Sequence, residues 1–360
     1  MKATLIALAL FALPMPLLSQ ELVEDEMVTM KARVLEVISS EVRAVPGTSV
    51  ESLFQSLRVR ILDGAQAGKE VTVENDFLEL REGDVFYLMH TTNSIDGTDH
   101  YSVRDPYRLP WLGALFVLFL AVVLFFGGKQ GLRGLLALGG GLFFIVFLLL
   151  PGILHGYSPV LVSVGVAALI IVLGSYVTHG FTRTTTTAVI GMVATVILTS
   201  VLAQLSIVLT RLSGFSEDEA IYLSFNTGGE LDLAGLLLGG MIIGALGVLY
   251  DAAIGQSVAV EELTTAAPEL SRFEIYKRAL RIGREHVGAL VNTLAIAYVG
   301  AALPLLLLFY GFGSESLEIA LNREIFATEI VRTLVGSIGI ILVVPITTLV
   351  ATRMLVKSAH

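Results

Sequence analysis

Seven apolar segments, each close to the length that crosses a bilayer, set the strongest limit on how this chain can fold. A bilayer core requires about 20 apolar residues in a helix, and every backbone polar group inside it must be hydrogen-bonded. Hydrophobic residues make up 54% of the chain and charged residues only 15%, which excludes an ordinary soluble enzyme. We therefore expect an α-helical polytopic membrane protein, with transmembrane helices over 109–127, 134–153, 159–177, 186–210, 232–254, 287–310 and 327–351.

The distribution of Lys and Arg between the connecting loops predicts the orientation of these helices. If the chain before the first helix is outside, the outer loops contain only Arg211 and Arg323. The asymmetry predicts a multi-pass protein of the plasma membrane with an extracytoplasmic N-terminal domain and a cytoplasmic C-terminus. The cations of the cytoplasmic loops are then Lys129, Arg133, Arg183, Arg272, Lys277, Arg278, Arg281, Arg284, Arg353 and Lys357.

The N-terminal part of the chain has two different patterns. Residues 1–19 combine Lys2 with a short apolar run, which indicates a signal peptide or an uncleaved anchor. Residues 20–107 are rich in short β-branched and aromatic runs separated by turn formers, and they predict a small extracytoplasmic β-barrel-like domain of OB-like shape. Such a domain is either a module without a site or a surface for an envelope partner protein. The expected strands are 28–37, 53–62, 69–73, 85–89 and 101–103.

Recognisable motifs for enzyme chemistry are missing from the sequence. The chain has no cysteine, and therefore no disulfide and no thiolate metal site. It contains no P-loop, no H-E-x-x-H and no G-x-S-x-G motif, and its 6 histidines are scattered. The net charge of −9 provides no basic excess for nucleic acid. We expect no enzymatic activity, no cofactor, no metal centre and no nucleic-acid partner.

Polar and ionisable side chains inside the predicted helices are the candidate functional residues, because placing such groups in a bilayer is costly. Asp251 lies near the cytoplasmic end of segment 232–254, next to Tyr250. Glu262 returns to the same helical face about 16 Å further along the axis. The two carboxylates can share one ion only if the helix breaks at Gly255. Asp251 is compatible with a functional role and, equally, with simple hydration at the membrane surface.

The last two predicted helices carry a second group of polar candidates. Asn292 and Tyr298 lie in the sixth, where the amide of Asn292 requires an interhelical or solute partner. Pro304 should kink this helix near its outer third. Glu329 and Arg332 lie three residues apart in the seventh helix, and we expect them to neutralise each other. For each group the alternatives are helix packing and the coordination or gating of a transported species.

Segment 232–254 is rich in glycine, with two pairs spaced four residues apart. Such pairs allow a neighbouring helix to approach closely. The same residues could instead form a hinge or an unobstructed path for a solute. They are Gly235, Gly239, Gly240, Gly244 and Gly247.

The cytoplasmic segment 257–286 has the pattern of a basic amphipathic helix. Ser271 and Glu274 match a capping box, which predicts a helix start. We expect residues 271–286 to contact anionic lipid of the inner leaflet, with a cytoplasmic partner or a gating lever as the alternative. The apolar positions at helical spacing are Phe273, Tyr276, Leu280 and Val287.

Short motifs in the helical part of the chain form a specific pattern through their order and spacing. They are Gly244-Ala-Leu-Gly-Val-Leu-Tyr-Asp251, Glu261-Glu262, Arg281-Ile-Gly-Arg-Glu-His286, Asn292-Thr-Leu-Ala-Ile-Ala-Tyr298, Leu303-Pro304, Asn322-Arg-Glu324, Glu329-Ile-Val-Arg332 and Gly336-Ser-Ile-Gly339. The pattern resembles the YibE/F family of polytopic bacterial membrane proteins, and the resemblance extends to the Glu82-Gly83-Asp84 turn. It implies an integral plasma-membrane protein with a multispanning bundle and no firmly assigned activity.

Three classes of function remain open, of which an intramembrane enzyme has the least support. A secondary transporter or channel-like protein for a small ion or solute is favoured by the intramembrane polar residues and the glycine-rich helix. A cell-envelope scaffold or assembly factor, whose β domain binds a partner, is the alternative. An inverted repeat, which many transporters contain, is not evident. The oligomeric state does not follow from the sequence.

Overall fold

The computed structural model describes residues 26–44, 51–76, 78–94, 96–216, 218–312 and 316–356. The chain divides into two compact units, Met1–Leu120 and Ala121–His360. The expected signal peptide or anchor over 1–19 lies outside the described residues, as does Lys357.

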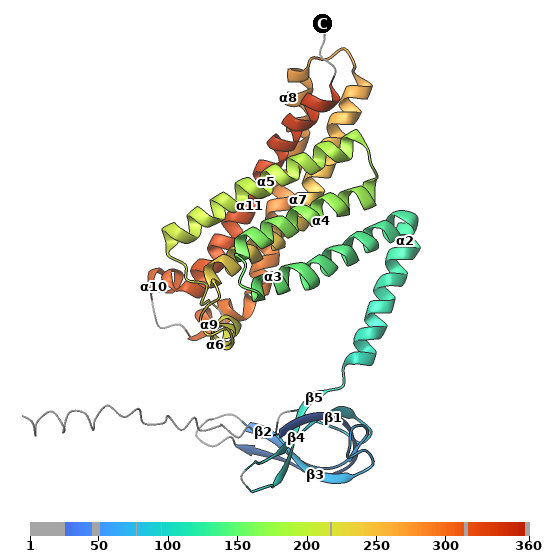
Figure 1. The fold of residues 1–360 in the computed structure, drawn as a ribbon, viewed down its shortest axis with the longest axis vertical. Helices are drawn as coiled ribbons and strands as arrows, with labels where there is room; N and C mark the ends of the chain where they lie inside the picture. The colour runs from blue at the N-terminus through green and yellow to red at the C-terminus, as the bar shows by residue number, and fades with distance from the viewer. Residues whose placement is uncertain are drawn as a thin grey trace, which may run out of the picture. The chain divides into compact units, whose positions relative to one another are not determined.

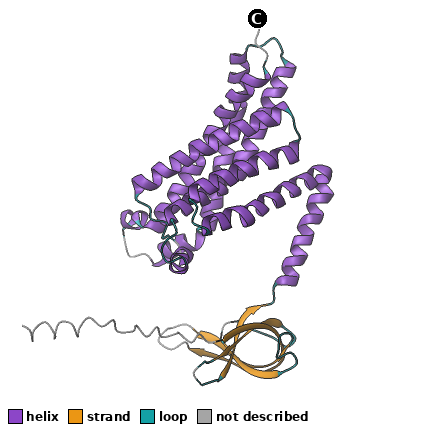
Figure 2. Ribbon diagram, viewed as in Figure 1, coloured by secondary structure: helices purple, strands orange, loops and turns teal. Residues whose placement is uncertain are grey.

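The N-terminal unit contains the five-stranded antiparallel sheet that the sequence predicts (Figure 2). Its strands lie in the order β3-β2-β1-β4-β5. The sheet curls because the first strand is long and bent: residues 26–33 pair with the fourth strand and residues 32–44 with the second, and the pairing with the second strand contains two register shifts. The strands are β1 (Glu26–Ala44), β2 (Glu51–Ile61), β3 (Glu70–Asn75), β4 (Val85–Thr92) and β5 (Asp99–Pro106).

The sheet encloses its own apolar core and forms a half-barrel. Phe86, Leu57 and Leu88 are fully buried between its curled halves. Within the described residues, backbone pairing does not join the edge strands β3 and β5. A side-chain contact lies between them, since the Nζ of Lys69, the residue before β3, donates a hydrogen bond of 3.0 Å to the hydroxyl of Tyr101 on β5. The domain is therefore a curled sheet, where the sequence suggested a barrel.

The helical part contains five described helices that are long and apolar enough to cross a membrane, or six if the bent pair α8 and α9 counts as one span. The elements are α2 (Leu109–Phe144), η1 (Ile145–Leu149), α3 (Leu150–Leu154), α4 (Pro159–His179), α5 (Arg183–Thr210), α6 (Asp218–Asn226), α7 (Leu233–Ala266), α8 (Arg272–Ala301), α9 (Leu303–Phe312), α10 (Leu317–Asn322) and α11 (Glu324–Leu355) (Figure 1).

The number of candidate spans is lower than the expected seven because the run Leu109–Leu154, which is 46 residues long, counts as one span. Its backbone is not helical at Gly128, where φ is 52° and ψ is −134°, a conformation that suits glycine. A Cβ atom added to Gly131 would overlap the carbonyl oxygen of Val123. Residues eight apart lie about 12 Å apart along a straight helix. The chain therefore reverses sharply here.

After this reversal, α2 runs alongside α4 in the opposite direction. The side-chain amide of Gln130 donates to the carbonyl of Thr178 at 3.3 Å. A Cβ atom added to Gly141 would lie 3.6 Å from Ile170. The turn that follows Gly128 thus lies at the end of the bundle where α4 ends.

Helices α8 and α9 meet at a bend of 63°. Ala302 separates them, and Pro304 is the second residue of α9. Proline lacks the backbone donor that a helix interior requires, but it is tolerated in a first turn. The predicted kink is confirmed, and it divides the sixth expected segment into two helices.

Glycines allow the central helices to approach closely, and several of them face hydroxyl-bearing side chains. A Cβ atom added to Gly191 on α5 would overlap Thr347 on α11. One added to Gly339 on α11 would lie 2.7 Å from the Oγ1 of Thr199 on α5. In lipid, where burial of apolar surface does not drive helix association, such close packing stabilises a bundle.

The last turns of α7 and α11 and the first turns of α8 form a projection with its own apolar core. Helix α7 has 34 residues and is about 51 Å long, whereas a bilayer core is about 30 Å thick. Figure 1 shows the ends of these helices together beside the C-terminus. The side chains buried between them are Val260, Ile275, Ala279, Ala351 and Val356.

The start of α8 confirms one prediction and corrects another. The capping box is present, because the backbone N–H of Glu274 donates to the Oγ of Ser271 and the N–H of Ser271 donates to Glu274. The predicted apolar face is confirmed in part: Leu280 and Val287 are partly buried and pack against the helical core, but Phe273 is 72% exposed. Ile275 and Ala279, which the sequence did not single out, are the buried residues at this end, where α8 packs against α7 and α11.

We predict that Gly191→Ala destabilises the helical bundle, because the new Cβ atom would force α5 and α11 apart. The expected cost is about 1–3 kcal/mol, measured as a lower melting temperature in detergent. Gly165→Ala on α4 is the matched control, since nothing lies within 4 Å of its added Cβ atom. Equal melting temperatures for the two variants would contradict the close packing.

Candidate functional site

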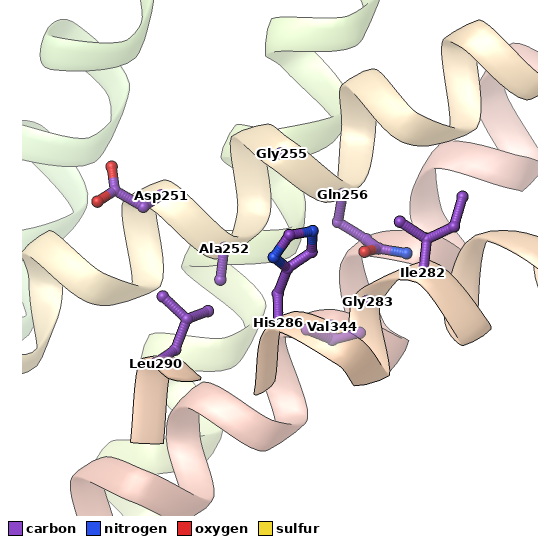
Figure 3. Close-up of a pocket in the computed structure, with 9 residues that line it drawn as sticks. All are labelled: Asp251, Ala252, Gly255, Gln256, Ile282, Gly283, His286, Leu290 and Val344. Carbon is purple, nitrogen blue, oxygen red and sulfur yellow. The ribbon is translucent and has the colours of Figure 1, made fainter. Parts of the chain in front are cut away.

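A cavity of about 300 Å³ lies between α7 and α8 and is shown in Figure 3. It combines one carboxylate, one amide and one imidazole with apolar groups. The residues that line it come from the consecutive helices α7 and α8 and from α11. They are Asp251, Ala252, Gly255, Gln256, Ile282, Gly283, His286, Leu290 and Val344.

One wall of this cavity is held by Gln256. Its side chain is 3% exposed, and its Nε2 donates a hydrogen bond of 2.8 Å to the backbone carbonyl of Ala279 on α8. A Cβ atom added to Gly283 would collide with Gln256 and Val344. Glycine at position 283 therefore brings α7, α8 and α11 together at the cavity wall.

The two titratable groups of the cavity, Asp251 and His286, are exposed residues on facing helices. In Figure 3 the imidazole of His286 stands next to Gln256, and the carboxylate of Asp251 points away from it. Asp251 was a candidate from the sequence, whereas His286 was not. The spacing of Gly283, His286 and Leu290, at three and four residues, would have placed them on one helical face.

A second polar group lies where α8 bends into α9. Arg332 and Glu329 form the predicted ion pair on α11, with 2.8 Å between Nη1 and Oε1 and with side chains 23% and 21% exposed. Glu329 lines a cavity of about 270 Å³ together with Tyr298. Arg332 and Glu329 both line a neighbouring cavity of about 210 Å³ with Ser216. The hydroxyl of Tyr298 is buried without a hydrogen-bond partner among the described residues.

One face of α7 extends between the cavity of Asp251 and the region of Tyr298 and Glu329. Gly240, Gly244, Gly247 and Asp251, spaced by four, three and four residues, are all exposed. A Cβ atom added to Gly240 or Gly247 would meet nothing within 4 Å, and one added to Gly244 would lie 3.0 Å from the hydroxyl of Tyr298. We call these four residues the open face of α7.

Two further glycines of α7 have a packing role. Gly235 and Gly239 are buried. A Cβ atom added to Gly239 would overlap the hydroxyl of Ser163 on α4. The five glycines that the sequence grouped together are thus divided: Gly235 and Gly239 are packed, Gly240 and Gly247 face open space, and Gly244 lies beside Tyr298.

Three sequence candidates lie outside these cavities. The hydroxyl of Tyr250 faces the carbonyl of Gly174 on α4 at 3.5 Å. Asn292 and Glu262 are exposed, and neither lines a cavity described above. Helix α7 continues through Gly255, so Glu262 and Asp251 cannot share one ion.

The described part of the chain also contains no group of three or more His, Asp or Glu side chains that could hold a metal ion.

Glu324, to which the sequence assigned no role, organises the end of the bundle where α5 ends and α11 begins. As the first residue of α11, it accepts hydrogen bonds from the backbone N–H groups of Ser213 and Gly214, both at 2.7 Å. The hydroxyl of Ser213 also donates to it at 2.8 Å. These contacts tie the loop after α5 to the start of α11. Glu324 belongs to the Asn322-Arg-Glu324 motif that the sequence showed. Its hydrogen-bond partners could not be predicted from that motif, because they lie more than a hundred residues away in the chain.

We predict that Arg332→Gln destabilises the protein more than the double variant Glu329→Gln/Arg332→Gln. The single change removes the cation that compensates Glu329 at a partly buried position. The expected loss in free energy of unfolding for Arg332→Gln lies between the ~1 kcal/mol of an exposed ion pair and the ~3–5 kcal/mol of a buried one. Melting temperatures in detergent measure the difference, and equal values for both variants would contradict it.

Comparison with protein families gives a match to the YibE/F-like protein family over residues 115–357. The matched region covers α3 to α11 and most of α2, and the β domain lies outside it. A comparison with curated proteins returned no match, and neither did a comparison with solved structures. The match includes both polar groups and the open face of α7, and it extends over more than half of the chain. The chain therefore belongs to the YibE/F-like family.

Proposed function

We propose that the helical domain is a secondary transporter or channel-like protein that moves a small ion or solute along the open face of α7. One observation supports this proposal above the others. A face of glycines with free space leads from Tyr298, beside the Glu329–Arg332 pair, to the cavity of Asp251 and His286. A glycine surface exposes backbone and leaves room for a passing solute.

The chemistry at the two ends of this face fits a polar cargo. At one end are a carboxylate, an amide and an imidazole, and at the other an ion pair beside a phenol hydroxyl. In a bilayer such groups are costly unless paired or hydrated, so their presence favours a hydrated route. The adjacent bend between α8 and α9 is an interrupted helix, a feature that transporter binding sites use.

We further propose that the run 109–154 crosses the membrane twice, which gives seven spans in total. The reversal at Gly128 supports this, and so does the contact of Gln130 with Thr178, which places the turn near Arg183 at the basic end of the bundle. The β domain is then extracytoplasmic and the C-terminus cytoplasmic. The exposed Lys277, Arg278 and Arg281 of α8 would face anionic lipid headgroups.

An envelope scaffold is the second candidate function, and one observation on the β domain favours it. Beyond the core, β1 continues as a hairpin with β2, on which Ile38 is 48% exposed and Val42 is 63% exposed. Apolar side chains on a protruding hairpin fit a partner protein at this surface.

We predict that Glu82→Cys and Gln130→Cys react with a membrane-impermeant maleimide from opposite sides of the membrane. The chain contains no native cysteine, so labelling reports only the introduced thiol. Glu82→Cys should react in intact cells and Gln130→Cys only after permeabilisation. Reaction of both in intact cells would show that residues 109–127 do not span the bilayer.

We predict that Gly247→Leu blocks transport, because the side chain would fill the open face of α7. The measurement is the elemental and metabolite content of cells that lack the protein, after rescue with wild type or a variant. Gly165→Leu on the exposed side of α4 is the control, and Asp251→Asn tests the carboxylate.

A solute restored by wild type and by Gly165→Leu, but not by Gly247→Leu, would support the route along α7. If no profile changes in the null cells, or if Gly247→Leu and Asp251→Asn both rescue fully, transport along this face is excluded. Loss of rescue on removal of the β domain alone would then favour the scaffold.

A further inference from the structure

Asn292 is a polar side chain on the outer surface of α8. It is exposed, and its side-chain amide makes no hydrogen bond within the part of the chain that the structure describes. The neighbouring Thr293 differs, because its hydroxyl donates to the carbonyl of Ala289 in its own helix at 2.9 Å. The amide of Asn292 therefore stands out as the group on this face that needs a partner.

The position of Asn292 inside an apolar stretch of α8 makes an unpaired amide costly. His286 is the last titratable residue before it, and no Asp, Glu, Lys, Arg or His occurs from 287 to 311. Asn292 lies about 9 Å beyond His286 along the helix axis, within the apolar stretch. Its side chain is too short to reach the membrane surface as Lys or Arg can. An unpaired amide facing lipid there would cost several kcal/mol.

The cavities of the candidate site do not supply the partner. Leu290 lines the cavity beside Asp251, and Leu294 is buried against Gly336 on α11. Asn292 lies two residues from each, about 160° around the helix from both. Its side chain thus faces away from α7 and α11.

We infer that this face of α8 is a contact surface for a second copy of the chain, with the two Asn292 amides hydrogen-bonded to each other across a two-fold axis along the membrane normal. An amide is both donor and acceptor, so two symmetry-related copies satisfy one another, as an isologous contact requires. No other residue type is needed on the partner.

The surroundings of Asn292 suit close approach of two identical helices. A Cβ atom added to Gly288 or Gly300 would meet nothing within 4 Å. The exposed surface between them carries Ala289 and Ile296, the latter 61% exposed. Small residues one turn from a polar one are typical of helix pairs in membranes. This contact does not depend on the proposed transport, since it lies on the other side of α8.

The test is disulfide crosslinking in native membranes with the full chain, which has no cysteine of its own. Ile296→Cys, one turn from Asn292, should give a covalent dimer after mild oxidation. Ile197→Cys is the matched control, because Ile197 on α5 is 52% exposed and also lies inside an apolar helix. It should remain monomeric.

The role of the amide is tested in the Ile296→Cys background. Asn292→Leu should lower the dimer fraction about 3- to 10-fold, the range expected for one interhelical hydrogen bond in a membrane. Asn292→Gln should retain it, and Thr293→Val should leave it unchanged. Size-exclusion chromatography in detergent checks that each variant is folded.

Two outcomes would overturn the inference. The first is a dimer yield from Ile296→Cys no higher than that from Ile197→Cys, which would mean that lipid or another segment covers this face. The second is an undiminished yield after Asn292→Leu, which would show that the amide is not the contact.

Discussion

Close approach of α5 to α11 and of α7 to α4, made possible by glycines that face hydroxyl-bearing side chains, is the interaction on which the helical domain depends. Gly191 lies against Thr347, and Gly339 lies against Thr199. In a bilayer, helices are held by packing and hydrogen bonds rather than by exclusion of water, so the distance between backbones decides stability. The hydroxyl of Thr195 donates to the carbonyl of Gly191 one turn earlier, whereas the hydroxyls of Thr199 and Thr347 are buried without a hydrogen-bond partner among the described residues.

The same packing positions the candidate site. Helix α7 is buried against α4, α5 and α11, and its open face is the side that these neighbours leave uncovered. Helix α8 borders that face, with Tyr298 beside Gly244 and His286 beside the cavity of Asp251. The bend at Ala302 brings the Glu329–Arg332 pair close to Tyr298. A transport route and a dimer contact can coexist because they use opposite sides of α8.

Features that depend on neighbouring residues were predicted from the sequence, and features that depend on distant partners were not. The capping box of Ser271 and Glu274, the pair of Glu329 and Arg332, and the bend near Pro304 all act over a few residues. The buried face of α8 was predicted only in part, because Leu280 and Val287 pack against the core but Phe273 is exposed. Which side of that helix is covered depends on α7 and α11, and small inward residues such as Ala279 carry little hydrophobic signal.

The amino-acid sequence by itself determined that the chain is a multi-pass helical protein with a small β domain, because hydropathy and strand alternation are local properties. It also identified the glycines and polar residues of α7, α8 and α11. Only the tertiary structure decided which of them meet. Gly239 is packed while Gly247 is open, Asp251 faces a cavity with His286, and Asn292 points outward. The physical reason is that the role of a small or polar side chain in a membrane helix is set by the groups that it contacts on neighbouring helices.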